Sequence, residues 1–427
     1  MALFRGSALR AALNLRLLPA SLNFSSTSLP LIDVGPLTNS AASVEEKQAV
    51  GRQLHDACLN VGFFYAQGHG VPAELTDSVM VEARKWFALP EEEKQRIALS
   101  PTSHYRGWQR LGSNVTQGKR DLHEGIDLYR EVDAAELAAA GLPASPIHGR
   151  NPWPQTPAFQ AALRAYVDEC LGLGAAILRG IALGLQLPET FFEGDMAGDS
   201  YWVSRILYYP SLPGQPASSS STTTSSSSGT SSSTSSVLGG AQQRQQQQQQ
   251  QQQQHASGSK AGSLEELSCG EHTDYGLLTL VFAEPGVTAL QVKSAEGQWL
   301  DAPPVPGAVV INIGDMFSVF TNGLYTPTAH RHAVQGLPAC LPACPPGPYQ
   351  VVNRSGRDRV SIPFFYETNF EAVIQPQPQF CVQRPAQFEA VRYGSHLESK
   401  VRGWSSAQLR SRCPCSHVLH NFDFESK

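Results

Sequence analysis

Short apolar runs separated by turn residues fill the chain beyond Tyr201 and restrict the folds that it can adopt. Glycine, proline or acidic residues interrupt the runs, as expected of strands joined by turns rather than of strands alternating with helices. This punctuation favours a β-sandwich or a double-sheet barrel. The runs are Ser204–Tyr209, Gly276–Phe282, Ala289–Val292, Ala308–Ile313 and Ser361–Tyr366.

The first half of the chain carries helical patterns instead. We expect helices at Val44–Val61 and at Pro72–Leu89, the second with proline at its start and Pro90 beyond its end. Between them, Gly62–Tyr65 is a short apolar run that suits a buried strand. Apolar residues recur every three or four positions through Pro157–Leu187, which predicts a long helix. The predicted fold is therefore mainly β, with an α-helical N-terminal region before the β core.

Two stretches interrupt this pattern. Residues 211–262 contain a serine- and threonine-rich tract and the glutamine run 245–254, too polar to offset the entropy lost on ordering, so we expect a disordered loop insertion. Residues 332–350 are rich in proline, alanine and cysteine. The predicted organisation is a targeting segment at 1–28, an N-terminal region at 29–135, a core at 150–385 that carries both insertions, and a tail at 386–427.

Composition excludes several classes of protein. The net charge of −5, with no basic stripe interleaved with aromatic residues, argues against nucleic-acid binding. The sequence has no apolar run of eighteen residues, so we expect no membrane span. Its 8 scattered cysteines suggest reduced thiols, and the tail cluster Cys413, Cys415, His417 and His420 lacks the usual spacing of zinc ligands. Oligomeric state leaves no signal in the sequence.

The first 28 residues resemble an organellar transit peptide. They contain Arg5, Arg10 and Arg16, many leucines, alanines and serines, and no acidic residue. The spacing of the arginines favours the mitochondrion over the plastid. A disordered start without a targeting role, which would leave the protein in the cytoplasm, is the alternative.

Three residues form a candidate iron site. His272 and Asp274 stand at the head of Gly276–Phe282, and if that strand extends back over them both side chains point to one face. His330 can supply a second imidazole. Two histidines and one carboxylate on one side of iron(II) leave positions open for O₂ and a co-substrate. His332 competes with His330, because residues two apart on a strand point the same way.

Arg359 and Ser361 form a second candidate pair, at the start of another strand. A guanidinium can bind a carboxylate through two hydrogen bonds, and a nearby hydroxyl can add a third, which suits a dicarboxylic acid. Tyr209 can contribute a hydroxyl to the same group. Taken alone, Arg359 fits an ordinary surface arginine equally well, and Tyr209 fits a core tyrosine.

These motifs occur together with others in an order that resembles a known family. The chain resembles the iron(II)/2-oxoglutarate-dependent dioxygenases, in the branch of isopenicillin N synthase and the plant flavonoid and gibberellin oxidases, and is most similar to an uncharacterised plant and fungal subgroup. The resemblance covers most of residues 30–385 outside the insertions. It rests on the segments Ile32–Val34, Gly62–Tyr65, Gly68–Gly70, Tyr105–Gly107, Asn114–Thr116, His123–Asp127, Met196–Asp199, Arg205–Pro210, His272–Leu280, Ile311–Asp315, Thr321–Gly323, His330–Arg331 and Arg359–Phe370.

The resemblance implies a fold and a set of ligands. The fold is a double-stranded β-helix, or jelly roll, after an α-helical N-terminal region. Iron(II) is bound by a facial triad, with His330 preferred to His332, while 2-oxoglutarate and O₂ are co-substrates and ascorbate supports turnover. The implied metal ligands are His272, Asp274 and His330, and those of 2-oxoglutarate are Arg359, Ser361 and Tyr209.

The implied activity couples oxidative decarboxylation of 2-oxoglutarate to hydroxylation or desaturation of a small metabolite. Substrate contacts are expected from Tyr105–Asp127, with Tyr105, Arg106 and Glu124 as candidates, although a packed loop fits each of them as well. Two alternatives remain open. One is an oxidase of this fold that does not use 2-oxoglutarate, and the other is a catalytically silent binding or regulatory protein.

The chain departs from the family pattern in two places. Members usually read His-Arg-Val-Val-Asn at the second histidine, and removing His332–Gln350 joins His330-Arg331 to Val351-Val352-Asn353. This stretch therefore behaves as an insertion, either genuine or from a retained intron, and is expected to leave from a strand with ligands at both ends. The second departure is Leu207, where several plant members carry an asparagine.

Overall fold

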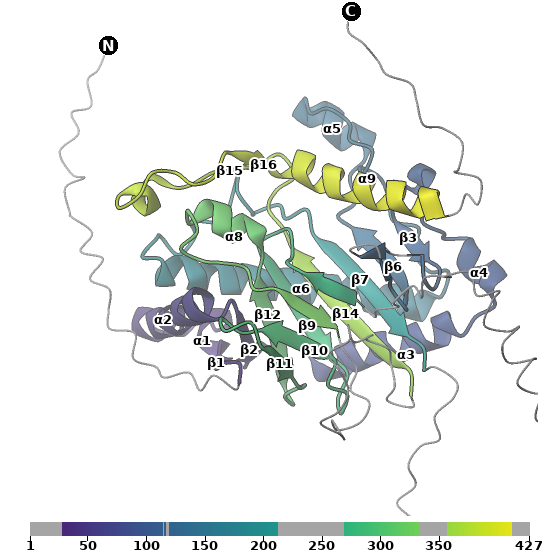
Figure 1. Cartoon of the computed structure of the whole chain (residues 1–427), viewed down its shortest axis with the longest axis horizontal. Coiled ribbons are helices and arrows are strands. Elements are labelled where there is room, and N and C mark those ends of the chain that lie inside the picture. Colours follow the sequence, from purple (N-terminus) through teal and green to yellow (C-terminus); the bar gives the residue numbers. More distant parts are fainter. Residues whose placement is uncertain (1–27, 114, 117–118, 212–268, 333–356, 412–427) are drawn as a thin grey trace, which may run out of the picture.

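The computed structural model describes residues 28–113, 115–116, 119–211, 269–332 and 357–411 (Figure 1). The segment 1–28, the two insertions and the cysteine- and histidine-containing tail fall almost entirely outside these residues. Within the described chain, no helix is both long and apolar enough to cross a membrane. Cys58, Cys170 and Cys381 are free thiols.

Most of the helices lie in the N-terminal half, as predicted. Helix α2 begins with a capping box, in which the Ser43 hydroxyl accepts from the Glu46 amide at 3.2 Å and the Glu46 carboxylate accepts from the Ser43 amide at 2.7 Å. The long C-terminal helix α9 runs along the side of the molecule away from α2 and α3 (Figure 1). The helices are α1 (Gly35–Thr38), α2 (Val44–Asn60), α3 (Ala73–Phe87), α4 (Glu91–Gln95), α5 (Ala134–Ala140), α6 (Pro157–Gly184), α8 (Asp315–Phe320) and α9 (Tyr393–Ser411).

The strands form two principal sheets. An 8-stranded sheet has the order β1-β2-β12-β9-β14-β7-β6-β3, and a 4-stranded sheet has the order β11-β10-β13-β8. Within both sheets, only β1 and β2 pair in parallel. The strands are β1 (Leu31–Asp33), β2 (Phe63–Gln67), β3 (Gly107–Gln109), β4 (Val115–Thr116), β5 (Lys119–Arg120), β6 (Glu124–Tyr129), β7 (Val203–Tyr209), β8 (Cys269–His272), β9 (Leu278–Ala283), β10 (Leu290–Lys293), β11 (Trp299–Ala302), β12 (Ala308–Ile313), β13 (His330–His332), β14 (Arg359–Tyr366), β15 (Val373–Ile374) and β16 (Val391–Arg392).

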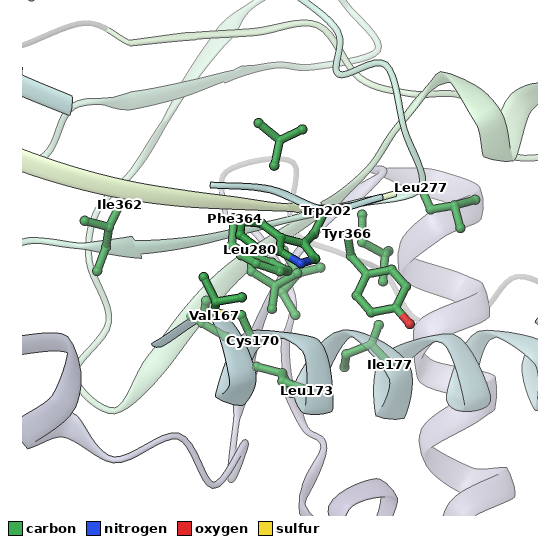
Figure 2. Packing of buried hydrophobic residues seen from close by; sticks show 14 of the residues in the cluster. Val167, Cys170, Leu173, Ile177, Trp202, Leu277, Leu280, Ile362, Phe364 and Tyr366 are labelled. Atoms are coloured by element: carbon green, nitrogen blue, oxygen red, sulfur yellow. The ribbon is translucent and has the colours of Figure 1, made fainter. Parts of the chain in front are cut away.

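One face of the large sheet packs against α6. Side chains alternate between the two faces of a strand, so Ile362 and Phe364 of β14 point to the helix side together with Leu280 of β9. Figure 2 shows them packed over Val167 and Cys170 of α6. Burying each large apolar side chain stabilises the fold by about 1.5–3 kcal/mol. Because Ile362 and Phe364 face α6, the alternate residues of β14 point to the other face of the sheet, where a ligand can bind.

The other face of the large sheet looks toward the small sheet. Phe63 and Val310 pack there against Leu290 and Val292, and together they fill part of the space between the sheets. Farther along the same face, polar residues replace the apolar ones. They are Thr279, Asn312, Arg359 and Ser361, whose shared side follows from the strand register. The two-sheet core after an N-terminal helical region confirms the predicted fold class.

Candidate metal centre and co-substrate site

Two neighbouring strands bring the candidate histidines together. His272 ends β8 and His330 begins β13, and the two residues stand directly opposite each other in the antiparallel pair. Their ring centroids lie 4.3 Å apart. Cross-strand neighbours on one face are held close by the strand spacing, so the sheet itself fixes this pair of imidazoles.

Asp274 reaches the histidines from a loop. β8 ends at His272 and β9 begins at Leu278 in the other sheet, so the expectation that one strand carries both His272 and Asp274 is wrong. The loop is tied to α8, because the Asp274 carbonyl accepts from the Asp315 amide at 2.8 Å and the Gly276 carbonyl accepts from the Met316 amide at 3.0 Å. The crossover between the sheets, rather than strand alternation, directs the carboxylate.

The loop needs glycine where it crosses α8 and the end of β14. A Cβ added at Gly276 would lie 1.2 Å from a carboxylate oxygen of Glu367, and one at Gly314 would lie 2.4 Å from the Gly276 carbonyl oxygen. Both contacts are far closer than atoms tolerate. Close backbone approach therefore requires glycine at both positions.

The donor atoms of the three residues surround a common point. Nε2 of His272 lies 3.7 Å from Oδ1 of Asp274, and Nε2 of His330 lies 3.7 Å from Oδ2. One ligand atom from each residue lies within 4.8 Å of the other two, so one ion can contact all three. Two imidazole nitrogens and one carboxylate oxygen are the donors of the facial iron(II) triad, and the residues fit that metal.

Neighbouring groups prepare these ligands. Burial alone would raise the pKa of Asp274, but the imidazoles of His330 and His272 lower it below its usual value, with hydrogen bonds from Thr279 and Asn312. The Thr279 hydroxyl and the Asn312 amide donate to Oδ2 at 2.5 and 2.7 Å. Such contacts orient metal-binding carboxylates. Thr279 and Asn312 lie in the recognised motifs, but sequence reasoning assigned them no role.

His330 is held as a neutral ligand. Its Nδ1 lies 3.2 Å from the Thr328 carbonyl oxygen, which can only accept, so Nδ1 carries the proton and Nε2 is left for a metal. Burial lowers the pKa of His330 to about 4, although Asp274 opposes the shift. The edge of Phe63 packs on the ring with centroids 5.1 Å apart.

A buried cation lies on the adjoining part of the large sheet. Arg359 is 2% exposed, pairs with Tyr209 across β14 and β7, and places its guanidinium 4.8 Å from the centre of the Tyr209 ring. Burial lowers the pKa of Arg359. Among the described residues, Arg359 Nη1 and Ser361 Oγ are buried without a hydrogen-bond partner. Two polar groups left in this state suit a bound carboxylate, which accepts from both.

Two further histidines border this second group. His332 is buried, and its ring centroid lies 6.4 Å from that of Tyr209. The ring of His123, just before β6, lies 5.4 Å from Tyr209 on another side. Burial, together with the charge of Arg359, lowers the pKa of His332 well below its usual value. Sequence reasoning considered His332 only as a rival metal ligand and assigned His123 no role.

The candidate substrate residues lie elsewhere. The Arg106 guanidinium is fully buried and donates to the carbonyls of Tyr129, Arg130 and Ile147 at 2.8–3.1 Å, and to the Asn151 side chain at 3.0 Å. These contacts hold loops of the N-terminal region together. A substrate contact at Arg106 is therefore not supported.

Glu124 and Tyr105 also have structural surroundings. The Glu124 carboxylate pairs with Lys94 at 2.7 Å and accepts from the Trp108 indole at 3.0 Å. It pairs in register with Tyr208, which stacks on Phe87 of α3, so Glu124 faces away from Tyr209. Tyr105 has a left-handed φ of 60° and packs against the core. The predicted substrate region instead supplies β3 and β6 to the large sheet.

The insertion at 332–350 begins where the chain changes sheets. β13 ends at His332 in the small sheet and β14 begins at Arg359 in the large one. The expectation that the insertion leaves from one strand with ligands at both ends is therefore wrong. Both flanking strands form their pairs, and such junctions accommodate extra residues at small entropic cost. Leu207, the other departure from the pattern, is buried opposite Ser361 and Gly125.

Comparison with known proteins identifies the family. Residues 29–156 match the N-terminal domain of the family described as non-haem dioxygenase in morphine synthesis, and residues 241–368 match the 2OG-Fe(II) oxygenase superfamily. A homoarginine-6-hydroxylase of Oryza sativa subsp. japonica is 38% identical over 88% of this chain and 96% of its own length. The chain belongs to the 2OG-Fe(II) oxygenase superfamily.

Other members agree in sequence and fold. A homoarginine-6-hydroxylase of Glycine max is 36% identical over 88% of this chain and 96% of its own length. The crystal structure of a full-length Neurospora crassa protein in complex with alpha-KG superposes with a TM-score of 0.63 at 21% identity, covering 89% of this chain and 98% of that one. This oxygenase is thus an iron(II)- and 2-oxoglutarate-dependent enzyme with the jelly-roll core, acting on a small molecule.

Proposed function

We propose that His272, Asp274 and His330 bind the iron(II), and that Arg359, Ser361 and Tyr209 bind the distal carboxylate of 2-oxoglutarate. The observation that carries the proposal is a fully buried arginine beside a cluster of three metal-binding side chains. Among the described residues, no salt bridge is formed by Arg359. A dicarboxylate that spans from the metal to the guanidinium accounts for both features.

Iron(II) and 2-oxoglutarate, when bound, supply the activation of O₂ that leads to hydroxylation of the substrate. The protein supplies geometry around them. The triad keeps one side of the metal open, and Thr279 and Asn312 fix the Asp274 carboxylate through Oδ2. The planar guanidinium of Arg359 would hold the distal carboxylate of 2-oxoglutarate when it is bound. Ascorbate is expected to support turnover by keeping the iron reduced.

The proposed substrate is a free cationic amino acid of the homoarginine class, hydroxylated on its side chain, rather than a nucleic acid. The rice and soybean relatives, which carry that activity in their names, match this chain over nearly all of their own length. A buried carboxyl group also lies beside the proposed metal site, because Glu367 contacts Gly276 in the loop that carries Asp274. A guanidinium or ammonium group nearby would provide that carboxyl with a charge partner.

The test is release of succinate and CO₂ from labelled 2-oxoglutarate by purified protein with iron(II) and ascorbate. We expect homoarginine to stimulate release more than lysine, and thymine to give none. Asp274→Ala should abolish both iron content and turnover, while Asp195→Ala, at an exposed site far along the chain, should change neither.

The outcomes separate the parts of the proposal. Iron retained in Asp274→Ala would refute the metal ligands. Iron binding and 2-oxoglutarate turnover without stimulation by any cationic amino acid would refute the substrate class alone. Turnover only after deletion of residues 332–350 would show that the insertion blocks this site.

We also propose that the protein is sent to an organelle, the mitochondrion in preference to the plastid. The arginine-rich, acid-free residues 1–28 support this. A fluorescent fusion should enter the organelle, and one lacking these residues should remain in the cytoplasm. Equal distribution of the two fusions would refute the proposal.

A further inference from the structure

Three buried polar atoms near Tyr209 have no hydrogen-bond partner among the described residues. They are Nη1 of Arg359, Oγ of Ser361 and Nδ1 of His332. Leaving one such atom unpaired is costly, and unpaired buried polar atoms are uncommon in a folded protein. Arg359 and Ser361 are explained by the proposed 2-oxoglutarate site. His332 is not, and the family pattern has an aliphatic valine after His-Arg.

The position of His332 follows from the strand. It lies two residues beyond His330 on β13, so the two imidazoles point to the same side of the small sheet, toward the large one. Its ring stands 6.4 Å from that of Tyr209, and the Arg359 guanidinium stands 4.8 Å from the same tyrosine ring. His332 and Arg359 therefore both lie close to one aromatic side chain.

His332 is not placed as a metal ligand. Among the described residues, the cluster able to hold an ion contains His272, Asp274 and His330 and does not include His332. Burial leaves 8% of His332 exposed, so bulk water cannot satisfy Nδ1. Among the described residues no atom satisfies Nδ1, and a ligand bound at Arg359 would bring an acceptor to it.

We infer that His332 donates a further hydrogen bond to the distal carboxylate of 2-oxoglutarate and so helps to select a dicarboxylic co-substrate. This inference rests on the co-substrate site proposed above. A neutral imidazole donates from one nitrogen, and a carboxylate oxygen accepts more than one bond, so His332, Arg359 and Ser361 can bind it together.

The experiment measures binding rather than turnover. Iron(II)-loaded protein is titrated without oxygen, and the absorption band of the metal–keto-acid complex gives the dissociation constant. Two ligands are compared: 2-oxoglutarate, and 2-oxopentanoate, which keeps the keto acid but lacks the distal carboxylate. The variants are His332→Val, which removes the imidazole and leaves an apolar side chain, and Arg359→Ala, with Arg331→Gln as the matched control on the opposite face of β13. Iron content is measured for each.

We expect His332→Val to weaken 2-oxoglutarate binding roughly ten- to hundred-fold, as for a hydrogen bond to a charged group. Binding of 2-oxopentanoate should stay within about twofold, because it has no distal carboxylate to lose a donor. Arg331→Gln should change neither, since Arg331 bonds Gln291 at 2.9 Å and stacks on Trp299 instead. A structural role for His332 would weaken both ligands equally, so the difference between the ligands is decisive.

Three results would overturn the inference. The first is that His332→Val keeps the full preference for 2-oxoglutarate over 2-oxopentanoate while Arg359→Ala loses it. That result would overturn the inference and leave the proposed co-substrate site intact. Unchanged discrimination in both variants would refute the site itself and the inference with it. Loss of iron from His332→Val would identify His332 as a metal ligand instead.

Discussion

Replacing Arg359 should change stability and co-substrate binding in opposite directions. Its guanidinium is 2% exposed and forms no salt bridge among the described residues. A buried charge without a partner costs several kcal/mol, and the contact with the Tyr209 ring recovers only about 0.5–2 kcal/mol. In the absence of 2-oxoglutarate, Arg359→Met should therefore stabilise the protein by about 1–3 kcal/mol, because methionine fills much of the space without charge.

The ligand should then lose its effect. At a 2-oxoglutarate concentration of about 100 Kd, binding stabilises the wild type by about 2.7 kcal/mol. If Arg359→Met weakens binding a hundredfold, the same concentration gives only about 0.4 kcal/mol. Adding 2-oxoglutarate should therefore stabilise the wild type by about 2.3 kcal/mol more than Arg359→Met, and so reduce or reverse the difference between their melting temperatures.

Calorimetry of iron(II)-loaded protein without oxygen measures both quantities, with Arg331→Met as the control for loss of an arginine outside the site. The control should keep the full shift on adding 2-oxoglutarate. A lower melting temperature for Arg359→Met without ligand, combined with an unchanged ligand shift, would refute the reasoning. Arg359 would then be a structural residue whose buried atoms are satisfied by the fold.

Three further predictions concern the surroundings of the site. Asn312→Leu removes one donor to Asp274 and should lower iron affinity about ten- to hundred-fold in chelator competition; unchanged affinity would contradict a positioning role. Burial raises the pKa of Glu367 to about 8, so its carboxyl stays protonated in the folded state below that pH. Because the unfolded chain releases this proton at a lower pH, the free energy of unfolding should fall as the pH rises from about 5 to 8. In urea unfolding, wild type should lose roughly 3 kcal/mol relative to Glu367→Gln over this range, whereas parallel profiles would show that Glu367 does not titrate there. Arg106→Met should destabilise the fold by roughly 3–5 kcal/mol with 2-oxoglutarate affinity unchanged, and a fully stable variant with a raised KM for substrate would restore the substrate-binding interpretation.

The principal elements were predictable because their signals are local. Ala308–Ile313 was expected as a strand and forms β12 with the same bounds, and Val44–Val61 forms α2 within one residue. The spacing of apolar residues and the turn residues involve only a few neighbouring positions, so they can be read directly from the sequence. β8 and β13 were not predicted, because each is at most four residues long and carries polar side chains toward the site.

The site was predicted in its residue types and not in its geometry. The sequence named His272, Asp274 and His330, but it placed the first two on one strand. In the structure His272 ends β8 and Asp274 lies in the loop that crosses from the small sheet to the large one, while His272 faces His330 across a strand pair. Strand pairing joins positions far apart in the chain, and no local pattern records which strands become neighbours.

Two arginines show most clearly what the tertiary structure decided. Arg106 and Arg359 each stand in a motif shared with the family, and the sequence proposed Arg106 as a substrate contact and Arg359 as a ligand of 2-oxoglutarate. Both are fully buried, but the Nη1 and Nη2 atoms of Arg106 donate to carbonyl oxygens of its own fold, whereas Nη1 of Arg359 has no protein acceptor among the described residues. The sequence determined which residues can donate. Only folding decided which donors the protein itself satisfies and which remain for a ligand, because that depends on backbone groups brought together from distant parts of the chain.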